Sequence, residues 1–170
     1  MRKIFALTLA VLMLLALAAC GKDANTPTTT ASGNKPPVVD PDNSFCFTYE
    51  GVKLIPGAVF DGSKLPAVES ADNPDCVGSG KFTTYYHDPD MELTTNTNGG
   101  HELIYSIYIV DPNCSTDEGL YLGDTAQQVT QLYGEDCEKD EGLWTYRKGN
   151  TLLVILIEDD LVTSIEFKMA

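Results

Sequence analysis

Thiols have the widest chemistry in this 170-residue chain, because a cysteine can carry a lipid, form a disulfide, bind a metal or act as a nucleophile. Cys20 stands apart, since it follows an apolar run and two alanines. The other four cysteines are even in number and widely spaced: Cys46, Cys76, Cys114 and Cys137. Zinc sites need close Cys-x-x-Cys pairs or histidine partners. The spacing therefore predicts disulfides, with three pairings open, and neither a metal nor another cofactor.

Imidazole and carboxylate groups indicate no catalytic residue. His87 and His101 are the two histidines, and neither has a serine or cysteine nearby in the pattern of a nucleophile, so we expect both to be exposed turn residues. Acidic runs cover residues 135–141 and 158–160. Their spacing differs from that of calcium-binding loops, which favours a solvated acidic surface over calcium binding. Carboxylate pairs can be drawn between many of the 25 acidic residues, so such a pair is no evidence for glycoside hydrolysis.

Aromatic residues are better candidates for a function. Seven of them fall on expected strands: Tyr85, Tyr86, Tyr105, Tyr108, Tyr121, Trp144 and Tyr146. Strand alternation directs about half of such side chains to the core. Rings on an uncovered sheet face can anchor a protein or a carbohydrate. We select Tyr108, Trp144 and Tyr146 as the candidates for a binding face.

The charge of the chain argues against two classes of partner. Lysine and arginine number 11 against 25 aspartate and glutamate residues, which gives a formal net charge of −14. The basic residues form no stripe. An acidic surface repels polyphosphate and anionic lipid, so we expect no nucleic-acid binding and no adsorption to an anionic membrane.

The first residues have the pattern of an export signal. Arg2 and Lys3 precede an apolar run over residues 4–17, which is shorter than the roughly 20 residues of a membrane-spanning helix. The run ends in Leu-Ala-Ala before Cys20 and so resembles the bacterial lipobox, in which the cysteine is lipidated. We expect a lipoprotein signal peptide at 1–19. Two acyl chains on Cys20 would then hold the protein at the extracytoplasmic face of the cell membrane, a location that also favours disulfides.

The remaining chain divides into a tether and a folded domain. Residues 20–44 are rich in threonine and proline and poor in apolar side chains, which predicts a flexible tether. Residues 45–170 form the predicted domain. Within it, residues 46–54 align with 114–122 at Cys, Thr, Glu, Gly and Leu, which indicates pseudo-repeats of about 45–111 and 112–170. The repeat favours one disulfide in each half, pairing Cys46 with Cys76 and Cys114 with Cys137.

The pattern of the two halves predicts the fold class. Thr125 and Gln128 have the form of a capping box, and Gly134 is a helix stop, so we expect a helix between them. In the first half any helix within residues 58–68 is short or degenerate, because glycine and proline interrupt it. Strands are expected over residues 82–87, 92–96, 102–110, 143–147, 151–157 and 161–168. The sequence therefore predicts an α+β fold of two tandem copies of strand, helix and antiparallel meander, with helix packed on sheet.

Two resemblances rest on these motifs. Residues 118–134, with Gly119, Gly123 and Gly134 around the expected helix, resemble a phrase of small secreted α+β modules such as the beta-lactamase inhibitor protein and the small outer-membrane assembly lipoprotein. Residues 45–170 resemble uncharacterised lipoproteins of clostridial bacteria, whose halves carry a cysteine before a tyrosine-rich meander. The first resemblance implies a binding module without chemistry, and the second implies no known activity.

These features favour a membrane-anchored, non-catalytic binding module that docks a protein or an envelope polymer on its sheet face. A structural or assembly lipoprotein of the cell envelope would have the same features and stays an alternative. A hydrolase is the least favoured hypothesis, because the chain offers no ordered triad or ligand set.

Overall fold

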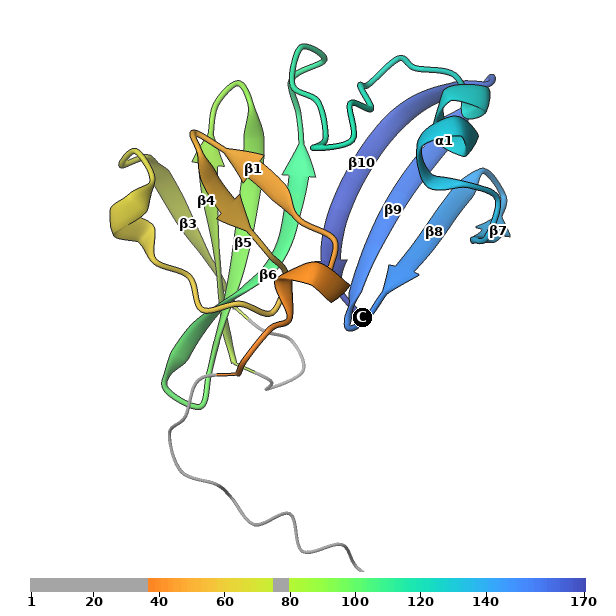
Figure 1. Ribbon diagram of the computed structural model, residues 1–170. Helices are drawn as coiled ribbons and strands as arrows, with labels where there is room; N and C mark the ends of the chain where they lie inside the picture. The colour runs from red at the N-terminus through yellow and green to blue at the C-terminus, as the bar shows by residue number, and fades with distance from the viewer. Residues whose placement is uncertain (1–36, 75–79) are drawn as a thin grey trace, which may run out of the picture. The chain divides into compact units, whose positions relative to one another are not determined.

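The computed structural model describes residues 37–74 and 80–170 (Figure 1). The predicted signal peptide, most of the predicted tether, Cys20 and Cys76 lie outside the described residues. All described residues belong to one compact unit, Asn34–Ala170.

Eight antiparallel strands form one sheet. The strands are β3 (Glu69–Pro74), β4 (Lys81–His87), β5 (Met91–Asn98), β6 (His101–Ile109), β7 (Glu138–Asp140), β8 (Leu143–Lys148), β9 (Thr151–Glu158) and β10 (Leu161–Met169). Their order across the sheet is β3-β4-β5-β6-β10-β9-β8-β7. The sheet therefore consists of two four-stranded meanders, β3 to β6 and β7 to β10, which are joined where β6 pairs with β10.

The junction between the meanders separates a buried face from an open one. Ile109 pairs with Ile165 and Ile107 pairs with Phe167, and all four side chains are fully buried. Successive strand residues point to opposite faces. The residues that alternate with these four are therefore on the other face, and they are mostly polar or aromatic. We call the two sides the core face and the open face.

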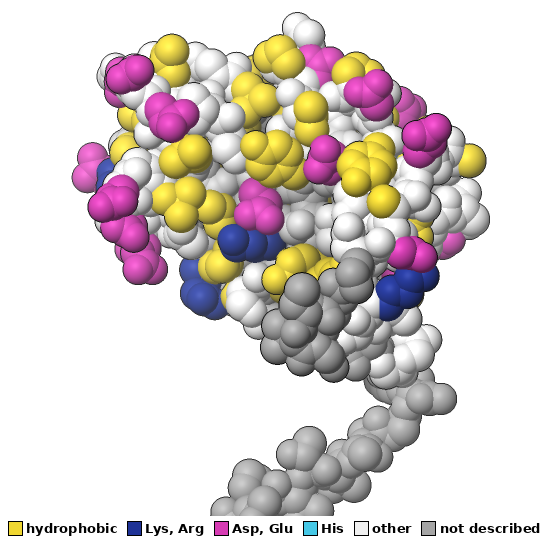
Figure 2. All heavy atoms as spheres, turned by 180° about the vertical axis from the view of Figure 1, so that it is seen from behind, with side chains coloured by type: hydrophobic (Ala, Val, Ile, Leu, Met, Phe, Trp, Pro, Cys, Tyr) yellow, Lys and Arg dark blue, Asp and Glu magenta, His cyan; other side chains and the backbone are white. Residues whose placement is uncertain are grey.

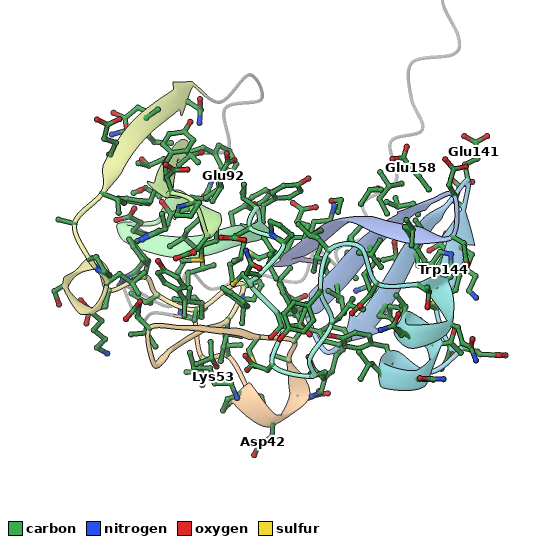
Figure 3. All side chains as sticks on the ribbon, turned by 90° about the horizontal axis from the view of Figure 1, so that it is seen from above. Asp42, Lys53, Glu92, Glu141, Trp144 and Glu158 are labelled. Atoms are coloured by element: carbon green, nitrogen blue, oxygen red, sulfur yellow. The ribbon has the colours of Figure 1, made fainter. Side chains whose placement is uncertain are left out.

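A hairpin and a helix cover the core face, and Figure 3 shows both on the same side of the sheet. Phe47 of the hairpin stacks on Phe167 with ring centroids 6.0 Å apart. Val129 of the helix is fully buried. The elements outside the sheet are β1 (Phe47–Tyr49) and β2 (Val52–Leu54) of the hairpin, α1 (Ala126–Tyr133), and two short 3-10 helices, η1 (Pro41–Asn43) and η2 (Gly62–Lys64).

The ends of α1 follow the sequence signals. The backbone N–H of Gln128 donates to Thr125 Oγ1 at 3.3 Å, and the Thr125 N–H donates to Gln128 Oε1 at 2.9 Å. Gly134 follows the helix with φ 82°, a conformation that glycine adopts without strain. The predicted capping box and helix are therefore confirmed. Of the helices in the described residues, none is long and apolar enough to cross a membrane.

The structure corrects the predicted α+β class to a mostly β fold with one eight-stranded sheet, a small hairpin and one short helix. The six predicted strands are present, and β3 and β7 extend the sheet at its two edges. The chain around 57–60 bonds to β6: Gly57 N donates to Ile104 O at 2.7 Å, Phe60 N donates to Glu102 O at 2.8 Å, and Val59 forms a bridge with Leu103. Residues 62–64 form the short helix η2, so the prediction of a short or degenerate helix within residues 58–68 is confirmed.

Replacing Phe167 by alanine is expected to lower the free energy of unfolding by about 3–5 kcal/mol, because the change leaves a cavity under Phe47 at the junction of the meanders. Urea denaturation followed by the fluorescence of Trp144 measures the loss. Phe82→Ala is the matched control, since Phe82 is only partly buried and lies on the open face. Equal losses for the two variants would contradict our assignment of the core face.

Candidate functional site

A line of acidic and tyrosine side chains crosses the open face. Strand register aligns them as direct neighbours on five adjacent strands. In strand order they are Glu69, Tyr86, Glu92, Tyr108 and Glu166. We call these five residues the acid–tyrosine row. Neighbouring strands lie about 4.8 Å apart, so the row is about 19 Å long.

The tyrosines of the row are open to solvent. Tyr86 and Tyr108 are each 39% exposed. Beside them Tyr105, the unpaired residue of a bulge in β6, is 41% exposed and packs edge-on against Phe82 with ring centroids 5.0 Å apart. Figure 2 shows this side of the molecule, where hydrophobic and acidic side chains lie next to one another. In the described part of the chain, helix and hairpin both lie on the opposite side from Glu92 (Figure 3).

The charges of the row are mostly uncompensated. Glu166 forms an ion pair with Lys168 at 3.2 Å, whereas Glu69 and Glu92 have no ion pair with any described residue. A shallow pocket of about 290 Å³ lies at the Glu69 end, where the turn between β4 and β5 forms part of its wall. A tyrosine face flanked by carboxylates attracts cations, because the negative face of the ring and the carboxylates act in the same direction.

The structure corrects two of the three predicted binding-face residues. Tyr108 lies on the open face, but Tyr146 is 3% exposed and donates its hydroxyl to the carbonyl oxygen of Gly134 at 2.9 Å. Trp144 is partly buried on the helix side of the sheet (Figure 3), with Lys139 Nζ 3.5 Å from its ring centre. The two residues alternate with the open-face positions of β8, so they present no ring to a partner on the open face, and Tyr146 packs against Tyr133 of α1.

Sequence reasoning missed Tyr86 and Glu92, although a signal for them exists. The tight turn Asp88-Pro89-Asp90 pairs His87 with Met91. The next pair outward must then be Tyr86 with Glu92, on the opposite face from the buried Met91. A register argument from this turn would have found the centre of the row.

His87 is buried, whereas the sequence predicted an exposed turn residue. It ends β4, is 3% exposed and lies edge-on to Tyr49 with ring centroids 5.3 Å apart. Neither ring nitrogen has a hydrogen-bond partner among the described residues. Burial lowers the pKa of His87, and the negative charge of Asp90 opposes this only in part. The prediction failed because the hairpin that covers the end of β4 was not expected there. His101 begins β6 and is partly buried.

Three cysteines lie in the described part of the chain, and all three are free thiols. The predicted disulfide between Cys114 and Cys137 is not formed. Cys114 lies near Asp90, beside the first meander, whereas Cys137 lies near Tyr146 at the far side of the second. The predicted partner of Cys46, Cys76, lies outside the described residues.

Cys46 and Cys114 lie in environments that disfavour the reactive thiolate form. Cys46 Sγ donates to Asp117 Oδ2 at 3.5 Å, and burial followed by this contact raises the pKa of Cys46. Burial and the charges of Asp90 and Asp111 raise the pKa of Cys114. A higher pKa means less thiolate at neutral pH, so both groups are expected to react slowly.

The acidic runs lie on exposed turns and an edge strand. Residues 138–140 form β7 and are exposed, and residues 158–160 lie at the turn between β9 and β10. Figure 3 shows Glu141 and Glu158 pointing away from the sheet. Within residues 37–74 and 80–170, no group of three or more His, Cys, Asp or Glu side chains could hold a metal ion.

No protein-family model matches the chain, and the comparisons with curated proteins and with solved structures find no match either. The two resemblances drawn from the sequence therefore stay predictions.

Acid is expected to destabilise the fold through His87. Burial holds the pKa of folded His87 below its ordinary value of 6.5, so the unfolded chain binds a proton that the folded protein resists. The contribution of His87 to stability is therefore complete above about pH 6.5 and is lost as the pH falls below that value. The neighbouring Asp90 opposes the effect, and Tyr49 stays neutral because burial and Asp90 raise its pKa to about 12.

The His87→Phe variant isolates this contribution. Its urea midpoint should exceed that of the wild type by a margin that grows as the pH is lowered from about 8 to about 5, the range in which histidine titrates. The His101→Phe variant serves as the control for loss of the other imidazole. Midpoints that fall in parallel for the wild type and His87→Phe would contradict the prediction.

Proposed function

We propose that this protein is a lipid-anchored, non-catalytic binding module whose acid–tyrosine row docks a basic segment of a partner protein. The observation that supports this is the row itself, in which exposed tyrosine rings alternate with carboxylates on a sheet face that no described element covers. Flat, rigid sheet residues with aromatic rings lose little conformational entropy on binding, which suits them to anchor a partner.

Charge complementarity favours a basic partner. The row carries three carboxylates, and the whole chain has a net charge of −14. An ammonium or guanidinium group over a tyrosine face gains about 0.5–2 kcal/mol, in addition to ion pairing with the flanking carboxylates. At each position of the row, a lysine or arginine side chain of a partner could therefore pair with a carboxylate or lie over a tyrosine ring.

The spacing of the row favours an extended partner. Its carboxylates are two strands apart, which is about 9.6 Å. In a polyproline II segment, every third residue returns to the same side after about 9.3 Å. Basic residues at every third position of such a segment would match the carboxylates one by one.

The proposed location of the protein is the outer surface of the cell membrane. We propose that Cys20 carries two acyl chains and that the chain from Cys20 up to η1 tethers the domain to the extracytoplasmic face of the cell membrane, while η1 and the buried Ser44 belong to the fold. A random coil of this length reaches roughly 25 Å, so the open face would stand clear of the lipid surface.

We also propose that the two meanders descend from one duplicated unit. Residues 46–54, which align with 114–122, form the hairpin in which Phe47 pairs with Leu54. The corresponding residues of the second half make a similar antiparallel bridge between Ser115 and Tyr121. Each bridged segment is followed by one four-stranded meander.

Alanine at Tyr86 or Tyr108 is expected to weaken the binding of a basic peptide about tenfold, because each change removes a ring at the centre of the row. The probe is a fluorescent proline-rich peptide with lysine at every third position, and its anisotropy gives the dissociation constant. Tyr121→Ala is the matched control, since Tyr121 is 41% exposed but lies outside the sheet.

The charge of the row is tested in the same assay. Glu92→Gln should weaken binding more than Glu158→Gln, although both variants remove one exposed carboxylate. If Glu92→Gln and Glu158→Gln weaken peptide binding equally, or if neither tyrosine variant of the row changes it, the peptide is held only by the general negative charge of the protein. Either result would contradict the proposed site. Binding of a purified envelope polysaccharide at the row, without binding of the peptide, would replace the proposed partner.

Serine at position 20 is expected to move the protein from the membrane fraction to the soluble fraction of the host cell, because it removes the sulfur that carries the acyl chains. Immunoblots of the two fractions measure the change. Cys46→Ser is the control and should stay with the membrane. Membrane retention of Cys20→Ser would contradict the anchor.

A further inference from the structure

A second pocket lies on the core face, beside the end of β4. Its volume is about 210 Å³, and its walls are mostly apolar. The lining includes Phe60, Leu65, Ala67, Tyr85 and His87. Phe60 and Tyr85 pack against each other with ring centroids 5.0 Å apart and form its aromatic side. The walls thus combine two rings, several aliphatic groups and one imidazole.

The imidazole of this pocket is the exception among the buried polar groups. The other six buried polar residues each have a hydrogen-bond partner: Ser44, Thr83, Thr84, Thr95, Thr116 and Thr151. His87 is as deeply buried, yet neither of its nitrogens has a partner in the described residues. An unsatisfied buried donor and acceptor cost about 1–3 kcal/mol each, so such a group requires an explanation.

The lining of the pocket restricts the charge of a ligand. Among the described residues it contains no Asp, Glu, Lys or Arg. Two carboxylates that contact the surrounding elements are already engaged, since Asp90 accepts from the Tyr49 hydroxyl at 2.7 Å and Glu102 accepts from the Tyr85 hydroxyl at 2.8 Å. An ionised ligand would leave water without finding a counter-charge in these walls, which is costly. An uncharged ligand avoids that cost.

The volume restricts the size of a ligand. An apolar cavity of about 150 Å³ holds one benzene molecule, so a pocket of about 210 Å³ has room for a six-membered ring with one small substituent. The aromatic walls favour an aromatic ring, and the imidazole favours a hydroxyl substituent that can donate to one nitrogen or accept from the other.

We propose that this pocket is a binding site for a small uncharged phenolic compound, whose ring packs against Phe60 and whose hydroxyl forms a hydrogen bond with His87. This hydrogen bond requires the imidazole to turn toward the ligand, because both of its nitrogens are buried as the ring now stands. His87 and Tyr86 are adjacent strand residues and point to opposite faces, so this site is separate from the acid–tyrosine row.

Titration with phenol, followed by NMR of the full chain, tests the proposal. We expect saturable shifts of the His87 imidazole signals and of the backbone amides around residues 60–68. Benzoate and benzylammonium, the anionic and cationic compounds of similar size, should bind at least about tenfold more weakly because of their charge. Absence of saturable His87 shifts, or binding of benzoate as tight as that of phenol, would overturn the proposal.

Two variants locate the site. Ala67 is exposed at the rim of the pocket, so Ala67→Trp should block it without disturbing the core and weaken phenol binding about tenfold or more. Ala71→Trp is the matched control on the open face of β3 and should leave the affinity unchanged. His87→Phe, which keeps an aromatic ring but removes both nitrogens, should abolish the preference for phenol over toluene. Equal phenol affinity in Ala67→Trp and the wild type would place the binding elsewhere and overturn the proposal, whatever the outcome at the row.

Discussion

The pairing of β6 with β10 holds the two meanders in one sheet, and both faces depend on its register. On the core face it brings Ile107 and Phe167 together beneath Phe47. On the open face it sets Tyr108 against Glu166, which makes the acid–tyrosine row continuous across the junction. A slip of one residue would turn the buried set to solvent at a cost of about 1.5–3 kcal/mol for each large side chain. Hydrophobic burial on one side therefore fixes the geometry of the charged side.

Strand β4 shows how closely the two proposed sites are linked to one turn. Tyr86 contributes to the row, and the next residue, His87, lines the phenolic pocket on the opposite face. The turn that follows is tied to the hairpin, because the Tyr49 hydroxyl donates to Asp90 at 2.7 Å. The hairpin thus buries His87 and also braces the turn that sets Tyr86 against Glu92. A single local arrangement supports a hydrophilic surface and an apolar pocket.

The sequence predicted the elements whose signals are local. The capping box of Thr125 and Gln128 marked α1, and apolar runs between turn residues marked six strands. The edge strand β7 was not predicted, because its residues Glu138–Asp140 are charged and exposed. Only their pairing with β8 makes them a strand. Non-local pairing therefore decided that strand. In the first half, the glycine and proline residues predicted a short or degenerate helix within residues 58–68, and the structure has the three-residue helix η2 there.

Face assignments were harder to predict than strands. In β8, Leu143 and Trp144 are both hydrophobic, so alternation alone does not say which of them faces the core. The pairing of Trp144 with the buried Ile155 decides it, and that pairing follows from the sheet as a whole. The turn at 88–90 is different, because its tightness fixes the partner of Tyr86 from sequence alone. The pairing of Tyr86 with Glu92 at the centre of the row could therefore be predicted from the sequence. The placement of Trp144 and Tyr146 on the core face could not.

The burial of His87 is the one place where the described core departs from the rules that govern the rest of it. Threonines at comparable depth are all hydrogen-bonded; Thr95, for example, donates to Glu102 at 2.6 Å. A phenylalanine at position 87 would fill similar space without an unsatisfied nitrogen, so stability alone gives no reason for an imidazole there. Sequences break local consistency mainly where function requires it. A polar group in an apolar, uncharged pocket can fix the orientation of a bound ligand through a hydrogen bond, whereas the apolar walls recognise only its shape. This gain in binding specificity is the physical advantage that offsets the lost stability.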